Sequence, residues 1–435
     1  MSSTGTAPEQ PSTADTPAAR ERGWFRSFAM DTRPLRAAPY RRLWLSTAVT
    51  AVGSQLTAVA VPKQVYDLTG SSGYVGLAGA AALVPLLVFG LWGGAVADAV
   101  DRRKLLLVSN TGIALTSVAL WLQAFARVDS VWLVLGLLAV QQSFFAVNQP
   151  ARQASIARLI EPALLPAANA LGGTVFTFGS VFGPMLAGSL IPVLGLSTLY
   201  LIDAIGLTVT IWAVWKLPPL PPLTGAGDKS RRAGLASMID GFRYLATKKV
   251  LLVSFLADII AMTAGMPRAL FPAMAAHSFG SADGGLALGW LFAALPLGAF
   301  VCGLTSGRLS RVRRHGVGIT FAVGLWGVAI IGLGLAHSLW LAVVWLAIGG
   351  VADMISMVFR GAMLQTVATD EMRGRMQGVF TVVVAGGPRL ADLLHGTVGA
   401  AVGTTWAVSG GGALVLVLLI PAVALAPAFW RYRSP

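Results

Sequence analysis

The sequence predicts an all-α membrane protein with twelve transmembrane helices in two pseudo-symmetric six-helix bundles. Apolar residues make up 55% of the 435 positions and charged residues only 11%, whereas a soluble domain carries roughly 25% charged residues. The apolar residues are gathered into segments of about 20 residues, the length that a helix needs to cross the ~30 Å hydrocarbon core of a bilayer. A chain with so little charge has no polar surface with which to face water.

The expected spans follow one another with short polar breaks. They lie near residues 43–66, 74–97, 105–126, 131–151, 168–193, 197–215, 250–275, 284–306, 317–336, 339–361, 376–401 and 405–429. The long break between the sixth and seventh spans is rich in proline and then in glycine and basic residues, a composition typical of a linker.

The domain organisation follows from these breaks. Residues 1–40 are polar and rich in Pro, Ser, Thr and Ala without an apolar signal-peptide region, so we expect a disordered N-terminal tail. We expect a first six-helix bundle at 41–216, a central linker at 217–249, a second bundle at 250–429 and a short C-terminal tail at 430–435.

The distribution of basic residues predicts the orientation. Of the 32 lysine and arginine residues, 28 fall in the N-terminal tail, the linker, the C-terminal tail and the loops on that same side, while Arg127 alone lies plainly in a loop on the other side. Because basic loops stay in the cytoplasm, we expect a multi-pass protein of the cell (inner) membrane whose N- and C-termini both lie in the cytoplasm. The net charge of +14 is thereby explained by contact with the lipid bilayer, and no compact basic patch indicates nucleic-acid binding.

The two expected bundles resemble each other. Three landmarks recur at offsets of 205 to 209 residues, namely Val61-Pro62-Lys63 with Met266-Pro267-Arg268, Gly94/Asp98/Arg102 with Gly303/Gly307/Arg311, and Asn169-Ala170 with Gln377-Gly378. Such a duplication of a six-helix unit places a substrate site near the midplane, between the two copies.

The loop after the second span carries the most specific motif, Gly94-x-x-x-Asp98-x-x-Asp101-Arg102-Arg103-Lys104. It resembles the signature loop of the major facilitator superfamily, and the resemblance implies the fold of that superfamily and a gating role. Gly94 permits close helix approach, Asp98 can accept hydrogen bonds, and the arginines can pair across the interface between the halves. The second-half counterparts are Gly303, Gly307 and Arg311, so a glycine replaces the acid there and the latch is expected to depend on Asp98. The alternative is a basic loop with a helix-capping aspartate.

The fifth span contains a second motif, Gly179-x-x-x-Gly183-Pro184-x-x-x-Gly188. It is similar to the antiporter motif of exporters of the same superfamily, with alanine at one glycine position, and the resemblance implies export rather than uptake. Small residues let helices approach, and an internal proline removes a hydrogen bond and bends the helix. The alternative is generic small-residue packing.

Charged residues within the expected spans are the remaining signal. Arg389, Asp392 and His395 follow at intervals of three in span 11, while Asp258 and Asp353 lie in spans 7 and 10. Because a charge inside the bilayer is costly, such residues are expected to face a cavity or a partner. We expect them to line a substrate and proton pathway, in which an unpaired aspartate can hold a proton. The alternative is a set of contacts that pin helices together.

Several polar residues remain ambiguous. Lys63 and Arg268 follow prolines at equivalent places, and they can either extend to the membrane surface or form a basic external gate. Asp67, four residues after Lys63, can neutralise it. Gln55, Gln141 and Gln142 can hydrogen-bond either a substrate or a neighbouring helix.

Local sequences narrow the resemblance. Tyr66-Asp67-Leu68-Thr69-Gly70, Tyr40-Arg41-Arg42-Leu43-Trp44 and Gly241-Phe242-Arg243-Tyr244-Leu245 resemble the subgroup that includes enterobactin-type siderophore exporters and macrolide efflux proteins. One departure is that the arginine which many proton-coupled drug exporters carry in span 4 is missing between Val131 and Val147, where Gln141 and Gln142 stand instead.

The expected function is secondary-active, proton-coupled export of a small amphipathic molecule (a drug, siderophore or secondary metabolite) by alternating access. Translocation of a lysophospholipid or another lipid, uptake by symport, and a non-transporting sensor or scaffold remain alternatives. No nucleotide-binding or metal-ligand spacing occurs, and Cys302 is the one cysteine. We therefore expect no enzyme, no cofactor and no metal, and a monomer whose partners are its substrate, protons and lipid.

Overall fold

We describe the fold from a computed structural model that defines residues 30–221, 239–280, 285–309, 312–424 and 426–433. These residues form helices joined by short turns, with no strand among them. The first half contains η1 (Arg33–Arg36), α2 (Ala38–Thr69), α3 (Ser72–Ala99), α4 (Arg102–Phe125), α5 (Val131–Leu159), η2 (Pro162–Leu164) and α6 (Leu165–Trp215). The second contains α8 (Lys249–Ala264), η3 (Arg268–Leu270), α9 (Phe271–Ala273), η4 (Met274–Ser278), α10 (Gly285–Leu304), α11 (Ser306–Leu309), α12 (His315–Gly334), α13 (Leu339–Val367), α14 (Asp370–Val402), α15 (Thr404–Ala424) and α16 (Pro427–Arg431).

These helices supply twelve membrane spans, as predicted. Within the described residues, ten helical segments are long and apolar enough to cross a bilayer. One of them contains α6, which is two spans joined at Gly195, where a φ of 73° breaks the helix. The remaining span is α14, in which Arg389, Asp392 and His395 lower the hydropathy. The chain is therefore a multi-pass, all-helical membrane protein.

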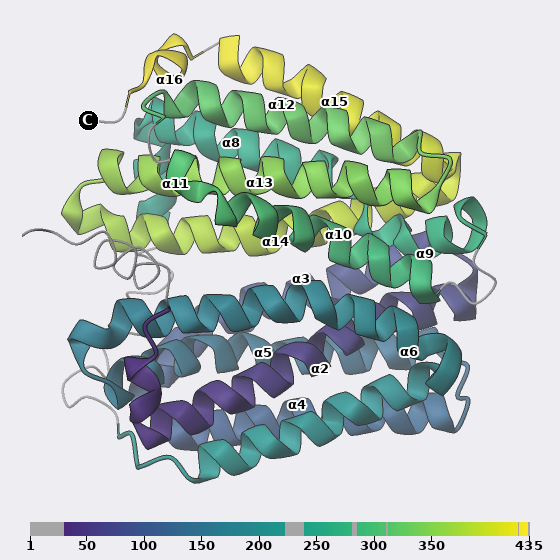
Figure 1. The fold of residues 1–435 in the computed structure, drawn as a ribbon, viewed down its shortest axis with the longest axis vertical. Coiled ribbons are helices and arrows are strands. Elements are labelled where there is room, and N and C mark those ends of the chain that lie inside the picture. Colours follow the sequence, from purple (N-terminus) through teal and green to yellow (C-terminus); the bar gives the residue numbers. More distant parts are fainter. Residues whose placement is uncertain (1–29, 222–238, 281–284, 310–311, 425, 434–435) are drawn as a thin grey trace, which may run out of the picture.

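The helices are arranged as two bundles, which lie one above the other in Figure 1. The lower bundle contains α2 to α6 and the upper bundle α8 to α16. We call the end where α6 finishes and α8 begins the linker end, on the left of Figure 1, and the opposite end, where α2 turns into α3, the hairpin end.

The ordered segments differ from the expected boundaries at three places. Residues 1–29 of the expected tail lie outside the described part, but η1 and the start of α2 at Ala38 fall before residue 40. Residues 222–238 of the linker are also outside it, whereas residues 239–247 of the linker are helical. At the other terminus, α16 crosses the expected boundary at residue 429.

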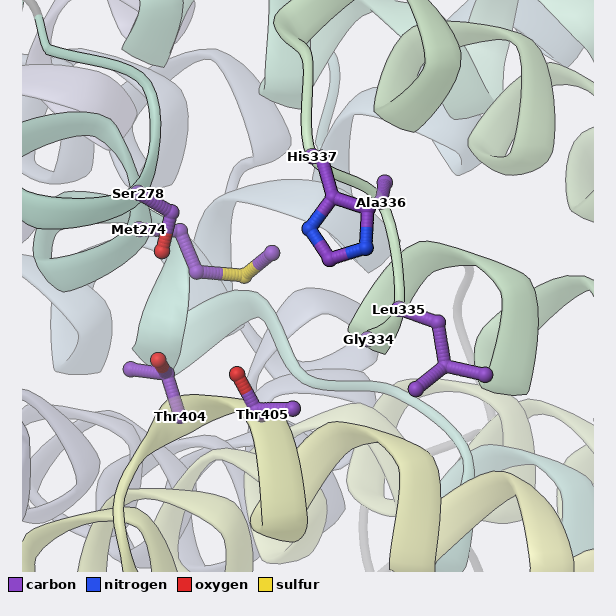
Figure 2. Close-up of a pocket in the computed structure, with 8 residues that line it drawn as sticks. All are labelled: Met274, Ser278, Gly334, Leu335, Ala336, His337, Thr404 and Thr405. Atoms are coloured by element: carbon purple, nitrogen blue, oxygen red, sulfur yellow. The ribbon is translucent and has the colours of Figure 1, made fainter.

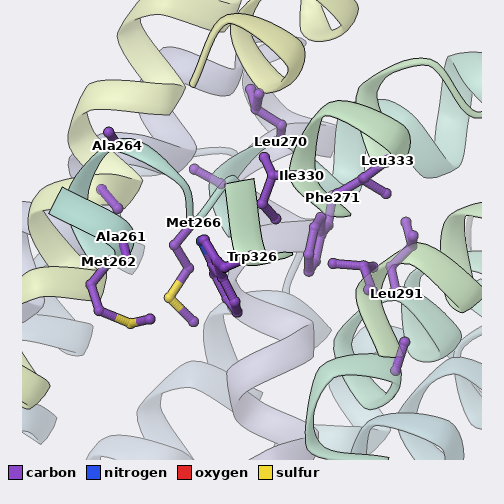
Figure 3. Close-up of a cluster of buried hydrophobic side chains, with 14 of the residues drawn as sticks. Ala261, Met262, Ala264, Met266, Leu270, Phe271, Leu291, Trp326, Ile330 and Leu333 are labelled. Carbon is purple, nitrogen blue, oxygen red and sulfur yellow. The ribbon is translucent and has the colours of Figure 1, made fainter. Parts of the chain in front are cut away.

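Trp326 of α12 organises the core of the second bundle (Figure 3). Its side chain is 1% exposed and lies among residues of α8, the η3–α9 segment and α10. The absence of a side chain at Gly265 makes room for the indole, because a Cβ there would lie 2.5 Å from the Trp326 Nε1 atom. A small residue opposite a large one is how close-packed interiors fill their volume.

The two bundles touch through glycines near the hairpin end. A Cβ on Gly396 of α14 would lie 2.6 Å from the Cα of Gly76 in α3, and one on Gly79 would lie 2.5 Å from the Cβ of Asp392. A second crossing joins α6 to α10, where a Cβ on Gly188 would lie 2.8 Å from the Cα of Gly289. Only glycine permits backbones to approach this closely.

The same helices separate toward the linker end. On α3 the glycine face continues to Leu83, whose Cδ1 lies 3.8 Å from the Cβ position of Gly386, and then to Gly90. At Gly90, and at Gly378 in the linker-end half of α14, a Cβ would meet no heavy atom within 4 Å. The backbones of the two bundles therefore touch near the hairpin end, whereas Gly90 and Gly378 have no heavy atom within 4 Å of a Cβ position, and in Figure 1 the ribbons of the bundles are further apart at the linker end.

We expect Gly76→Leu to disfavour this linker-open arrangement, because a Cβ at residue 76 would lie 2.5 Å from the backbone oxygen of Asp392. Overpacking typically costs about 1–3 kcal/mol, so labelling of a cysteine placed at Gly378, in a Cys302→Ala background, should slow by about tenfold. Gly90→Leu is the matched control on the same helix. Equal labelling rates in the two variants would contradict the assignment of this crossing.

Candidate substrate and ion pathway

Arg389 joins the two bundles near the middle of the membrane. Its Nη2 atom donates a 3.1 Å hydrogen bond to Oε1 of Gln142 in α5. The pair is only partly buried, so Arg389 keeps further N–H donors available beside the contact between the bundles. Gln142 is one of the two glutamines in span 4, where many proton-coupled drug exporters carry an arginine. In this chain, Gln142 accepts a hydrogen bond from an arginine of the opposite bundle.

Asp392 lies one turn further along α14 and packs against Gly79 of α3. The backbone amide of Ala269 and the charge of Arg268, both in η3, face its carboxylate together with Arg389. Its Oδ1 atom has no hydrogen-bond partner among the described residues. Arg389, Asp392 and Arg268 therefore form a junction cluster with one excess positive charge, at the point where α3, α14 and η3 meet.

His395 does not point toward that cluster. Its Nε2 atom lies 2.9 Å from the backbone oxygen of Ala264, within its own bundle, and its ring packs against Gly411. Each residue of an α-helix advances by about 100°, so two steps of three residues turn the side chain by roughly 120°. The spacing that suggested one shared face therefore separates His395 from Arg389.

Arg360 of α13 is a functional candidate that the sequence analysis missed. Span 10 was expected to end at residue 361, so Arg360 lay in its last turn and was counted with the basic residues of the following loop, but α13 continues to Val367 and buries it. Its Nη1 atom forms an ion pair with Oδ1 of Asp258 in α8, and both side chains are 3% exposed. The idea of an unpaired Asp258 is therefore wrong. The signal available in the sequence was the apolar continuation of the helix beyond Arg360.

Asp353 shares the same arginine. It lies seven residues before Arg360 on α13, and its Oδ1 atom is 3.8 Å from Arg360 Nη2. Beside these groups is a small cavity of about 10 Å³, which is roughly the space that one water molecule needs. Its lining includes both aspartates, Ser356, Trp326 and Met262.

The first bundle holds a buried carboxylate, Asp203 of α6, that the sequence analysis also missed. It is 3% exposed, and its Oδ2 atom accepts hydrogen bonds from Thr57 at 2.8 Å and from Ser117 at 3.0 Å. Gln141 donates in turn to Ser117 at 3.0 Å, so Gln141 serves this network and not the contact between bundles. An aspartate in the middle of an apolar span was the overlooked signal.

The signature loop is only partly described. Asp101 caps α4 by accepting from the backbone amides of Arg103 and Lys104, and Arg102 and Arg103 donate to the backbone oxygens of Ala154 and Trp215. These contacts tie α4 to α5 and α6 within the first bundle. Three further residues were predicted to take part in gating. The side-chain surroundings of Gly94 and Asp98 and the position of Arg311 lie outside the described part. Gly303 in α10 faces Met354 at 3.8 Å, and Gly307 is in α11.

The glycines of the span 5 motif face two partners. Gly179 packs against Ala51 of α2, and Gly183 packs against Gln55 of the same helix. Gly188 and the backbone oxygen of Pro184 instead face Gly289 of α10 in the other bundle. The motif thus forms the α6 side of the second crossing.

Polar contacts also join residues at the hairpin end. Lys63 and Asp67 form an ion pair at 2.6 Å between Nζ and Oδ2, as the four-residue spacing suggested. Next to them, Tyr66 Oη and His277 Nε2 lie 2.9 Å apart and connect α2 with η4 across the two bundles.

A wider pocket lies at the hairpin end. It belongs to the second bundle, and the side chains of His337, Ser278 and Thr405 that line it (Figure 2) are all exposed. No charged acidic or basic residue besides histidine lines it, so it does not join the pathway of Arg389 and Asp392. Across the described part of the chain, no group of three metal-type ligands is assembled.

Comparisons with known proteins agree with this architecture. A family model described as "transmembrane secretion effector" matches residues 29–429. The enterobactin exporter EntS of Escherichia coli O9:H4 (strain HS) is 30% identical over 426 residues, covering 94% of this chain and 97% of that protein. The EntS protein of Citrobacter koseri is 31% identical over 425 residues, with the same coverage.

Solved structures show the same fold at low identity. A bacterial homologue of the human lysosomal transporter Spinster has a TM-score of 0.68 and 16% identity, covering 92% of this chain and 97% of that one. The nucleoside transporter NupG has a TM-score of 0.67 and 13% identity, covering 90% and 98%. Likeness at this level of identity supports the architecture alone.

The hydrogen bonds to Asp203 predict a stability effect. Thr57→Val should remove one of its two hydroxyl donors and lower the free energy of unfolding by about 1–3 kcal/mol, because it leaves a buried carboxylate under-satisfied. Thr50→Val is the control, since Thr50 only bonds oxygens of its own helix. Denaturation of the purified protein in detergent measures both, and equal losses would show that the Asp203 contact carries no special weight.

Proposed function

Because the chain belongs to the transmembrane secretion effector family of the major facilitator superfamily, we propose that this membrane transporter is a secondary-active exporter of a small amphipathic molecule. The observation that carries the proposal is the junction cluster: Arg389 and Asp392 lie where the two bundles meet, on α14 between the glycine crossing at Gly396 and the linker-end Gly378. A site between two repeats, open to one side only, is what alternating access requires.

The glycine crossings supply the pivot for this motion. They hold the bundles together near the hairpin end, whereas the linker-end glycines Gly90 and Gly378 have open space in front of them. Rocking of one bundle against the other would close that space and open the hairpin end. The hydrogen bond between Arg389 and Gln142 lies on the path of this motion, so binding of a substrate there can bias it.

The direction of transport rests on the relatives and on the orientation. The EntS proteins are named as exporters of enterobactin, a siderophore, and the Gly183-Pro184 motif at the α6–α10 crossing resembles that of exporters. We place the linker end in the cytoplasm, because the basic residues of the tails, the linker and the loops gather there. The open side would then load substrate from inside the cell.

The junction cluster also suggests what part of a substrate it holds. Its excess positive charge and the spare N–H donors of Arg389 suit an acceptor or anionic group on an otherwise apolar molecule. We also propose that export is coupled to proton movement. The ionisable residues within the membrane spans support this, because such residues commonly serve as proton carriers in transporters. Since both halves of the pathway come from one chain, a monomer surrounded by lipid is sufficient.

The orientation is testable with reporters. A fluorescent protein that matures only in the cytoplasm should be bright when fused after residue 435, because the linker end and the C-terminus share one side. A phosphatase active only outside the cytoplasm should be active when fused after Arg127, between α4 and α5. Activities in the opposite pattern would reverse the proposed orientation.

Export is testable by accumulation of labelled siderophores and macrolides in a deletion strain and its complement. The complemented strain should retain less of the transported compound, and an uncoupler should remove the difference.

Arg389→Gln should reduce transport efficiency by roughly tenfold to a hundredfold, the equivalent of losing a charge-assisted hydrogen bond of about 1.5–3 kcal/mol. Arg127→Gln, in the exposed turn after α4, is the control. Equal accumulation of every compound in both strains would contradict the proposal.

A further inference from the structure

We propose that Asp258, Asp353 and Arg360 form a proton-binding site inside the second bundle, in which Asp353 carries the proton. We call these three residues the α8–α13 triad. This inference rests on the proposed function, since it names where a transport proton would bind. Figure 3 shows the neighbourhood on the α8 side, where Met266 lies between Met262 and Trp326 in the view.

The charge count of the triad is the first argument. Two carboxylates face one guanidinium, so the triad carries one excess negative charge when both aspartates are ionised. An uncompensated charge in a low-dielectric interior is strongly unfavourable. A single proton taken from water would bring the triad to neutrality without moving any helix.

Among the described residues, Arg360 is the one cation that forms an ion pair with either aspartate. Lys249 begins α8 nine residues before Asp258, and Arg375 of α14 pairs with Asp240 instead. The cavity beside the triad has Asp258 and Asp353 as its ionisable lining. Arg360 stacks over the ring of Phe380 from α14, at 5.8 Å. The remaining titratable side chains of the packed helices α10 and α12 are Cys302 and His315, and His315 stacks on Phe359 at 5.2 Å, beside Arg360 on α13. None of these groups supplies a second positive charge next to Asp353.

Distances and exposure indicate which carboxylate takes the proton. Asp258 is 3% exposed and in direct contact with Arg360, so its charge is balanced. Asp353 is 3.8 Å from the guanidinium and 27% exposed. It also lies 14 residues from each end of α13, near the middle of the bilayer. Asp353 is therefore the less enclosed member, it lines the cavity that has room for about one water, and the arginine compensates it less.

A metal cation fits this site poorly. Hard divalent cations take about six or more oxygen ligands, whereas the polar lining of the cavity consists of two aspartates, Ser356 and the indole of Trp326. The cavity volume of about 10 Å³ leaves room for roughly one water, which is enough to deliver a proton to Asp353 or accept one from it.

A short packing path connects the triad to the junction cluster. Met262 of α8 lines the cavity of the triad and also packs against Gly387 of α14, whose Cβ position lies 3.0 Å from Met262 Cβ. Gly387 is two residues before Arg389. Protonation of Asp353 would change how Arg360 is shared between the aspartates, and the α8–α14 contact can carry that change to the interface between the bundles.

Infrared difference spectroscopy on the purified full chain in lipid vesicles tests the site, with pH as the only variable. Wild type should show the carbonyl stretch of one protonated carboxyl that disappears as the pH rises. Asp353→Asn should lose this band. Asp258→Asn should lose it too, because Asp353 and Arg360 would then form a balanced pair. Arg360→Gln should keep the band to a higher pH, by about one unit or more, since no cation remains, whereas Arg360→Lys should behave like wild type.

The outcomes separate this site from simpler explanations. A band that persists in Asp258→Asn would overturn the charge-count argument. A band that persists in Asp353→Asn but is lost in Asp203→Asn would overturn the site and assign the bound proton to Asp203 in the first bundle. Because Asp353 is partly exposed, we expect the Asp353→Asn variant to fold, which size-exclusion chromatography checks. The test then remains valid even if the Arg360→Gln variant does not fold.

The readout also separates the site from the proposed function. It needs no substrate, so a wild-type band with no compound exported would leave the proton site standing while the proposed function fails. Export that still depends on the proton gradient in Asp353→Asn would overturn the site while the exporter remains. The uncoupler experiment in the deletion and complemented strains supplies that second measurement.

Discussion

The backbone contact of α3 with α14 at Gly76 and Gly396 is the interaction on which the rest of the structure depends. With the equivalent crossing of α6 and α10, it brings the two bundles together near the hairpin end. In a bilayer no hydrophobic effect drives helices together, so close van der Waals packing between small residues must supply the attachment. The closest backbone approaches are thus at the hairpin end, and the junction cluster around Arg389 lies on α14 between this crossing and the linker end.

The bilayer imposes a second constraint, since a polar group within it finds no water and must be satisfied by protein. The chain meets this requirement differently in each place. Asp203 accepts two hydroxyl hydrogen bonds inside the first bundle, Arg389 reaches across to Gln142 in the other bundle, and Arg360 is shared by two aspartates inside the second. The first arrangement fixes helices, the second depends on the relative position of the bundles, and the third leaves one charge without compensation.

These differences explain why one class of sequence signal led to different outcomes. Each of Asp258, Asp353, Arg389, Asp392 and His395 was recognised as a costly charge within a span, and the structure does place them among partners. It groups them differently from the sequence, however. His395 turns away from Arg389 to bind the backbone of α8, Asp392 is faced by η3, and Asp258 is joined to Arg360, a residue first counted with the basic loops.

Hydropathy and charge bias by themselves determined the fold class and the number of spans, because each crossing of a bilayer needs one long apolar segment whatever its neighbours are. The segments of 20 residues were sufficient for this. The family resemblance came from motifs, such as those at residues 94–104 and 179–188. Only the tertiary structure decided which polar residues meet, since those pairs come from helices far apart in the chain, as with Gln142 and Arg389. It also decided that Arg360 is buried, because α8 brings Asp258 alongside α13, where it pairs with the arginine.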